Sequence, residues 1–184
     1  HYYRIMSFHR HDVVGAVVPQ RFASAQNAAT YLSHDPEQPG NFGQFTLEVL
    51  KQADEVVDFA RFDNDGPDGV PNSGDDDGIV DAVFLILPWV PPNFLLSTAT
   101  GIAALGFEET FVIRDRGASG QPIVVAPNQG TIQQGRTFAE TVGVLCHEYG
   151  HILGLPDLFD TDFRRSDDVG PEHDSAGIGN WGLM

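Results

Sequence analysis

The feature that most constrains this chain is a pair of histidines separated by three residues, with a glutamate directly after the first. His147, Glu148 and His151 lie in the run HEYGHILGLPD, which spans residues 147–157. On a helix with about 100° between successive residues, both imidazoles project from one face one turn apart, as two ligands of one metal ion must. Glu148 falls about 100° from His147, where a carboxylate can act on a metal-bound water. The spacing therefore predicts a helix that carries a metal site with a base beside it.

The residues around the motif predict how this helix packs and where it ends. Apolar side chains recur opposite the histidines and predict a stripe that faces the core: Phe138, Val142, Leu145, Tyr149 and Ile152. Small residues on one flank, Gly143 and Gly150 among them, predict the close approach of another backbone. Gly154 predicts the helix end, because glycine commonly follows a helix C-terminus, and Pro156 prevents a restart. The turn then carries Asp157 back towards the metal.

The extended motif also carries a family resemblance. H-E-x-x-H-x-x-G-x-x-D resembles the metzincin pattern of zinc peptidases, in which the third ligand is usually histidine. With aspartate there, continued as LFDT over residues 158–161, it is similar to the immune-inhibitor-A-like secreted metallopeptidases of bacteria. The run GIGNWGLM over residues 177–184 resembles that family's G-x-G-x-W-x-(L/I)-M segment. The resemblance also reaches residues 2–8 and 62–66.

The resemblance implies a fold and a place in a longer protein. The expected fold is α+β, a metzincin-like zinc peptidase core with a mixed twisted sheet, an active-site helix and a backing helix. Residues 1–184 would form a single catalytic domain and a fragment of a longer secreted protein. Residues 1–154 would be its upper subdomain, and residues 155–184 the start of the lower subdomain through the Met-turn. Met184 would be the Met-turn methionine beneath the zinc.

The activity that the resemblance implies is zinc-dependent cleavage of peptide bonds in a protein or peptide substrate. His147, His151 and Asp157 would hold the zinc, and Glu148 would take a proton from the zinc-activated water and later deliver it to the leaving amine. Asp160 and His173 in the acidic loop after the helix remain alternatives for the third ligand. We prefer Asp157, because the Gly154 turn gives it the ligand position of the metzincin pattern.

A second metal type is predicted between residues 63 and 81, where aspartates alternate with glycines. So many carboxylates at close range repel one another unless a hard cation such as calcium shares them. The run departs from the EF-hand template, because Pro67 occupies its fifth position and no glutamate closes it. A solvated acidic loop is the alternative. The predicted ligands of a structural calcium are Asp63, Asp65, Asp68, Asp75, Asp77 and Asp81.

Composition and charge limit which partners and which alternative functions the chain can have. The formal net charge of −16 argues against nucleic acid, which needs a basic face. We expect no membrane span, and a single cysteine, Cys146, excludes a disulfide within the chain. Two other hypotheses stay open: a calcium-stabilised binding module with an inactive peptidase fold, and a structural zinc site that uses Cys146 with nearby histidines. Intact Glu148 argues against the first, and the direction of Cys146 on the helix argues against the second.

Periodicity predicts the other elements. His9, His11 and His34 are expected to be surface residues rather than ligands. Two strands are expected to pair as a hairpin just before the helix that carries His147 and His151. The expected elements are a helix that ends near residue 8, a strand over 12–18, a helix over 44–59, a buried central strand over 79–87, and the hairpin strands over 111–113 and 122–125.

Overall fold

The computed structural model describes residues 1–158 and 183–184. This part of the chain is α+β. Its helices are α1 (Tyr2–Met6), α2 (Phe42–Ala53) and α3 (Phe138–Ile152), with 3-10 turns η1 (Ala28–Tyr31) and η2 (Phe59–Phe62). Its strands are β1 (Val83–Leu87), β2 (Gly101–Ile102), β3 (Phe111–Arg116), β4 (Pro122–Val125) and β5 (Gly130–Gln134).

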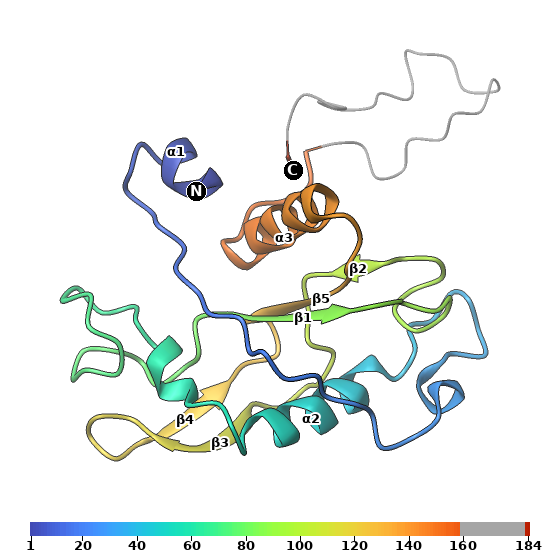
Figure 1. Cartoon of the computed structure of the whole chain (residues 1–184), viewed down its shortest axis with the longest axis horizontal. Helices are drawn as coiled ribbons and strands as arrows, with labels where there is room; N and C mark the ends of the chain where they lie inside the picture. Colours follow the sequence, from blue (N-terminus) through green and yellow to red (C-terminus); the bar gives the residue numbers. More distant parts are fainter. Residues whose placement is uncertain (159–182) are drawn as a thin grey trace.

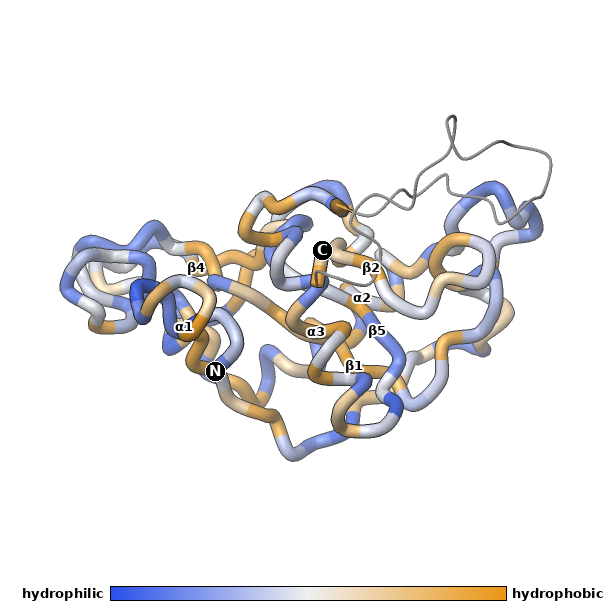
Figure 2. The backbone as a smooth tube through the Cα atoms, turned by 90° about the horizontal axis from the view of Figure 1, so that it is seen from above, coloured by the Kyte–Doolittle hydropathy of each residue, from blue (hydrophilic) through white to orange (hydrophobic). Residues whose placement is uncertain are grey.

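The sheet that positions α3, the helix of the histidine motif, is mixed and has the strand order β1-β5-β2. β1 runs parallel to β5 and β2 runs antiparallel to it. α3 lies on one side of this sheet, and α2 and the β3–β4 hairpin lie on the other (Figure 1). Seen from above, α3 crosses over β1 and β5 (Figure 2). The order α3, sheet, α2 places α3 on an outer layer.

The hydrophobic core fills the space between the sheet and α2. Leu50 of α2, Ile113 of β3, Ile123 of β4 and Ile132 of β5 are almost completely buried in it. The backbones approach closely in this layer, because a Cβ at Gly43 would lie only 1.9 Å from the Gly106 carbonyl oxygen. A glycine is therefore required where α2 meets the chain before β3.

Several predicted elements are confirmed. The hairpin forms, with β3 and β4 antiparallel and Phe111 opposite Val125. α1 ends at Met6, two residues before the predicted end, and α3 spans the motif. The helix predicted over 44–59 exists as α2, but it starts at Phe42 and ends at Ala53, where the chain turns toward η2.

Two strand predictions are wrong. Residues 12–18 form no strand, and Val17 is 91% exposed, so its apolar run is not buried in a sheet. The strand predicted over 79–87 is shorter and lies at the sheet edge rather than in its centre. The central strand is β5, whose first four residues are buried although its sequence, GTIQQ, is largely polar. Within the part of the chain that the structure describes, every helix is too short or too polar to cross a membrane.

Candidate metal centre

The beginning of α3 is fixed by a capping box. The Thr137 hydroxyl oxygen accepts a hydrogen bond from the Glu140 backbone amide, and the Glu140 carboxylate accepts one from the Thr137 amide. This arrangement satisfies two amides that the first turn of a helix leaves free. The sequence contains the signal for it, a threonine followed three residues later by glutamate.

The end of α3 is a Schellman turn centred on Gly154. Gly154 has a φ of +82°, in the left-handed region that glycine adopts without strain. Its amide donates to the His151 carbonyl, and the Leu155 amide donates to the Gly150 carbonyl. The predicted glycine stop is therefore confirmed. The turn brings the Leu155 carbonyl and then Asp157 back alongside the last turn of the helix.

Three side-chain atoms converge where the helix ends. His147 Nε2 lies 3.2 Å from His151 Nε2, and Asp157 Oδ1 lies 3.3 Å from the first and 3.5 Å from the second. Four donors at ~2.0–2.1 Å from a tetrahedral zinc ion lie roughly 3.4 Å apart. The three separations match the edges of such a tetrahedron and leave its fourth corner to another ligand. Asp157 Oδ1 is buried and accepts no hydrogen bond from the described residues, so it is available to a cation.

The far side of each imidazole is held by a backbone carbonyl. His147 Nδ1 lies 2.8 Å from the Leu183 oxygen, and His151 Nδ1 lies 2.8 Å from the Leu155 oxygen. A carbonyl oxygen can only accept, so each Nδ1 carries the proton and each Nε2 presents its lone pair to the cluster. The tautomer that a metal requires is thus set by the chain itself.

Glu148 lies in the interface between α3 and the sheet. It is buried, and its Oε1 would be 3.2 Å from a Cβ placed on Gly101 of β2. Burial raises the pKa of the Glu148 carboxyl above its ordinary value, an effect that neighbouring His147 and His151 oppose. A carboxyl with a raised pKa beside candidate metal ligands suits proton transfer. The closeness to Gly101 had no signal in the sequence.

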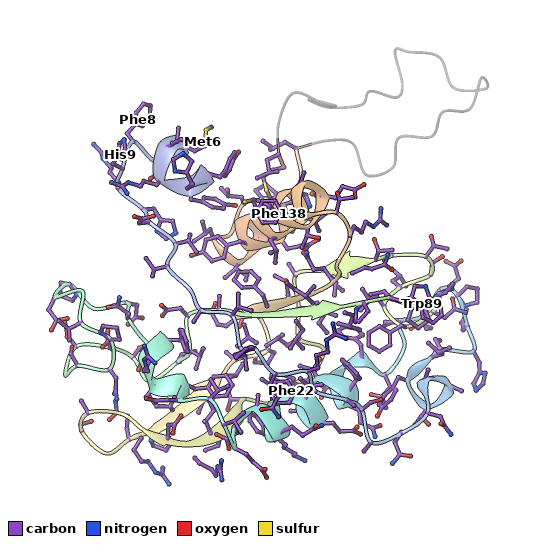
Figure 3. The ribbon with its side chains drawn as sticks, viewed as in Figure 1. Met6, Phe8, His9, Phe22, Trp89 and Phe138 are labelled. Carbon is purple, nitrogen blue, oxygen red and sulfur yellow. The ribbon has the colours of Figure 1, made fainter. Side chains whose placement is uncertain are left out.

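The packing of α3 differs from the predicted stripe. Phe138 is 86% exposed at the start of α3 (Figure 3), and Val142 is also exposed. The sheet also meets the face that carries Thr141, whose carbonyl accepts from Gln133 Nε2 of β5, and Glu148. The stripe prediction is therefore wrong for Phe138 and Val142, but Tyr149 does pack on the sheet, with its ring centroid 6.0 Å from that of Phe84 in β1.

The small-residue flank is also different from the prediction. Gly150 has two close neighbours there: a Cβ would lie 2.5 Å from Met184 Sδ and 3.0 Å from the Tyr3 hydroxyl oxygen. These are side chains and not a second backbone, and a Cβ at Gly143 would meet open space. Met184, the expected Met-turn residue, is thus buried against the turn between the two histidines. Half-buried Cys146 is in neither candidate metal group among the described residues.

The acidic loop brings together half of its predicted ligands. Carboxylate oxygens of Asp63, Asp65 and Asp77 lie within 4.8 Å of one another. Asp63 is completely buried, its Oδ2 accepts from the Gly78 amide, and its Oδ1 accepts nothing from the described residues. Burial, followed by neighbouring aspartates, raises the pKa of Asp63 to about 6.

The other three predicted calcium ligands lie outside this group. Their carboxylates accept hydrogen bonds from nearby backbone amides instead: Asp68 from Val70, Asp75 from Asp68, and Asp81 from Asn64. Asp68 and Val70 are two residues apart, as in an Asx turn, whereas the amides that Asp75 and Asp81 bind lie seven and seventeen positions away in the chain. Asp160 and His173, the alternative third zinc ligands, lie outside the described residues.

Comparison with known families agrees with the geometry of α3. The model of the immune inhibitor A peptidase M6 catalytic domain matches residues 116–184, which include α3 and every residue of the His–His–Asp cluster. The match supports an immune-inhibitor-A-like metallopeptidase, and hence a hydrolase with a protein substrate and a bound metal ion. A search of curated proteins found no match.

Proposed function

We propose that this chain is the core of a bacterial, secreted, zinc-dependent endopeptidase with a metzincin-like arrangement of its active-site helix. The observation that carries the proposal is the cluster of His147 Nε2, His151 Nε2 and Asp157 Oδ1, with separations of 3.2–3.5 Å that suit a tetrahedral ion. Both histidines also present the correct tautomer, since carbonyls hold their Nδ1 atoms.

The three ligands would hold zinc with one position open. Zinc, when bound there, supplies a Lewis acid that polarises the scissile carbonyl and lowers the pKa of a water. Glu148 accepts the proton of the attacking water and delivers it to the leaving amine. Its burial against Gly101 keeps the carboxylate in a fixed place beside the ligands. Asp157 brings a negative charge that histidine lacks, and so makes the bound water less acidic than three histidines would.

We also propose that a calcium ion binds Asp63, Asp65 and Asp77 and stabilises the fold. A completely buried carboxylate oxygen without a hydrogen bond costs free energy unless a cation or a proton compensates it. Carboxylate oxygens are the ligands that calcium prefers. The proposed role is structural, because the loop joins η2 to β1 across the buried Asp63.

The proposed activity is tested by replacing the base. Glu148→Gln in the full-length protein should lower kcat for peptide cleavage by about 1000-fold or more, since general-base catalysis alone contributes roughly 10²–10⁴-fold. Zinc should stay at one ion per chain, because this substitution leaves all three ligands in place. Exposed Glu109→Gln is the control and should keep full activity.

The outcomes separate the competing functions. Zinc bound by both proteins with cleavage only in the wild type supports the peptidase. Zinc bound without cleavage in either protein indicates the inactive binding module. Full activity in the Glu148→Gln protein contradicts the assigned base.

A further inference from the structure

The N-terminal turn contacts the metal helix directly. The Tyr3 hydroxyl donates a hydrogen bond to the backbone carbonyl of Cys146, 143 positions along the chain. Cys146 is the residue before the first histidine of the cluster. α1, which carries Tyr3, lies beside α3 on the side of the helix away from β5 (Figure 1). A side chain from the start of the chain therefore bonds the backbone of the turn that carries the ligands.

Gly150 gives the hydroxyl access to that turn. A Cβ at Gly150 would lie 3.0 Å from the Tyr3 oxygen and 2.5 Å from Met184 Sδ. Contacts this short do not occur for real side chains without a shift of the neighbours. Because Gly150 lies between His147 and His151, Tyr3 and Met184 contact the single turn that separates the two imidazoles.

The Tyr3 ring is held in place by a small aromatic cluster. It packs edge-on against Tyr149, with centroids 5.1 Å apart and planes at 74°. His11 stacks on Tyr149 as well, and its Nε2 lies 3.1 Å from the Tyr149 hydroxyl. His11, which was expected at the surface rather than as a metal ligand, is half-buried by these contacts and lies in neither candidate metal group of the described residues. Met6 and Phe8 lie exposed on the turn (Figure 3). Tyr3 and His11 are therefore the side chains through which this N-terminal segment contacts α3.

We propose that Tyr3 is a positioning residue of the metal site: its hydroxyl fixes the turn 146–150, and through it the directions of His147 and His151. Burial raises the pKa of Tyr3 to about 12, which keeps the hydroxyl protonated and able to donate. Small tilts of a ligand-bearing turn matter, because productive geometry tolerates only about 0.5 Å. The inference rests on the proposed zinc site.

Cobalt substitution tests it without relying on activity. Co²⁺ bound by the full-length protein gives a visible absorption spectrum that reports on ligand geometry, and titration gives its affinity. Tyr3→Phe keeps the ring contact with Tyr149 and removes only the hydroxyl. The expected result is a shifted cobalt spectrum and an affinity about fivefold weaker, the ratio that corresponds to one neutral hydrogen bond.

The matched control is Tyr2→Phe. The Tyr2 ring packs edge-on against Tyr3, and its side chain is exposed. This variant should keep the wild-type spectrum and affinity. With a peptide substrate, Tyr3→Phe should lower kcat by roughly the same factor and leave KM unchanged, at a temperature where both variants are folded.

Three results would overturn the inference, and they can be told apart. A Tyr3→Phe protein with a lower melting temperature but an unchanged cobalt spectrum shows a merely structural tyrosine. Equal shifts in both variants show a general effect of the aromatic cluster. A wild-type protein that gives no cobalt spectrum at all contradicts the proposed function as well.

Discussion

At the scale of single residues, the proposed third zinc ligand, Asp157, can be tested by substitution. Asp157 Oδ1 approaches both imidazoles and is buried without a hydrogen bond from the described residues. Asp157→Ala should therefore weaken zinc binding by about 100-fold or more, beyond the roughly 10–100-fold typical of residues that only support a ligand. Competition with a chelating dye measures this change.

The matched controls are the two residues that the sequence left as alternatives. Asp160→Ala and His173→Ala should each bind zinc as the wild type does. If one of them loses the zinc while Asp157→Ala keeps it, the ligand has been assigned to the wrong side chain and the helix motif still holds two of the ligands.

The candidate zinc ligands could be predicted from the sequence because their spacing is typical of a metal-binding helix and the turn after it. His147 and His151 must share a helix face, and a glycine turn must bring Asp157 back. The groups that orient these side chains could not be predicted from the sequence. The Leu155 and Leu183 carbonyls are backbone groups that every residue possesses, so the sequence does not distinguish these two carbonyls from the others. The contacts of the Tyr3 hydroxyl and of β2 with α3 join segments far apart in the chain.

At the scale of elements, the turn that ends α3 has a function beyond stopping the helix. Gly154→Ala places a side chain at a φ of +82°, which costs about 1–2 kcal/mol. It should also weaken zinc binding, because the same turn holds the Leu155 carbonyl against His151. Melting temperature and zinc affinity, measured together, check both effects.

Gly120 offers a control with the same backbone strain. Its φ is +85° and a Cβ there would meet nothing within 4 Å, in the loop between β3 and β4. Gly120→Ala should lower the melting temperature by a similar amount and leave zinc affinity unchanged. Equal losses of zinc affinity in the two variants would mean that the turn acts only through global stability.

The predicted elements succeeded where local pattern and tertiary packing agree. The β3–β4 hairpin and α3 carry strong local signals. β5 was missed because its buried Thr131 and Gln133 read as polar, although the strand lies in the centre of the sheet. The apolar run over 12–18 was expected in a sheet, and yet its valines stay exposed. Periodicity states which faces are apolar but not what covers them.

At the scale of the whole molecule, an acidic chain carries a buried carboxyl whose protonation should control its stability. The pKa of Asp63 is raised to about 6 in the folded protein from 3.8. The folded state therefore binds this proton more tightly than the unfolded state. The stabilisation is complete below the unfolded value and is lost as the pH rises through about 6. Without calcium, the protein should melt at a lower temperature at about pH 7.5 than at about pH 5.

Saturating calcium should reverse this dependence, because protons compete with the ion for the same oxygens. Asp63→Asn should abolish both the calcium-dependent rise in melting temperature and most of the pH effect. Exposed Asp68→Asn, outside the cluster, should keep both. A melting curve that calcium leaves unchanged at about pH 7.5 would contradict the calcium proposal.

The layer order has a consequence for how the molecule acquires its site. In the part of the chain that the structure describes, the main hydrophobic core contains no residue of α3, and the only buried residues of that helix are Glu148 and Gly150. Units held by few apolar contacts open more readily than the core that supports them. The proposed metal ligands all lie on α3 and the turn that follows it, so a bound ion would order this outer layer without adding a contact to the core. Metal loading should then stabilise the outer helix locally, while the core beneath it keeps the same stability with or without the ion.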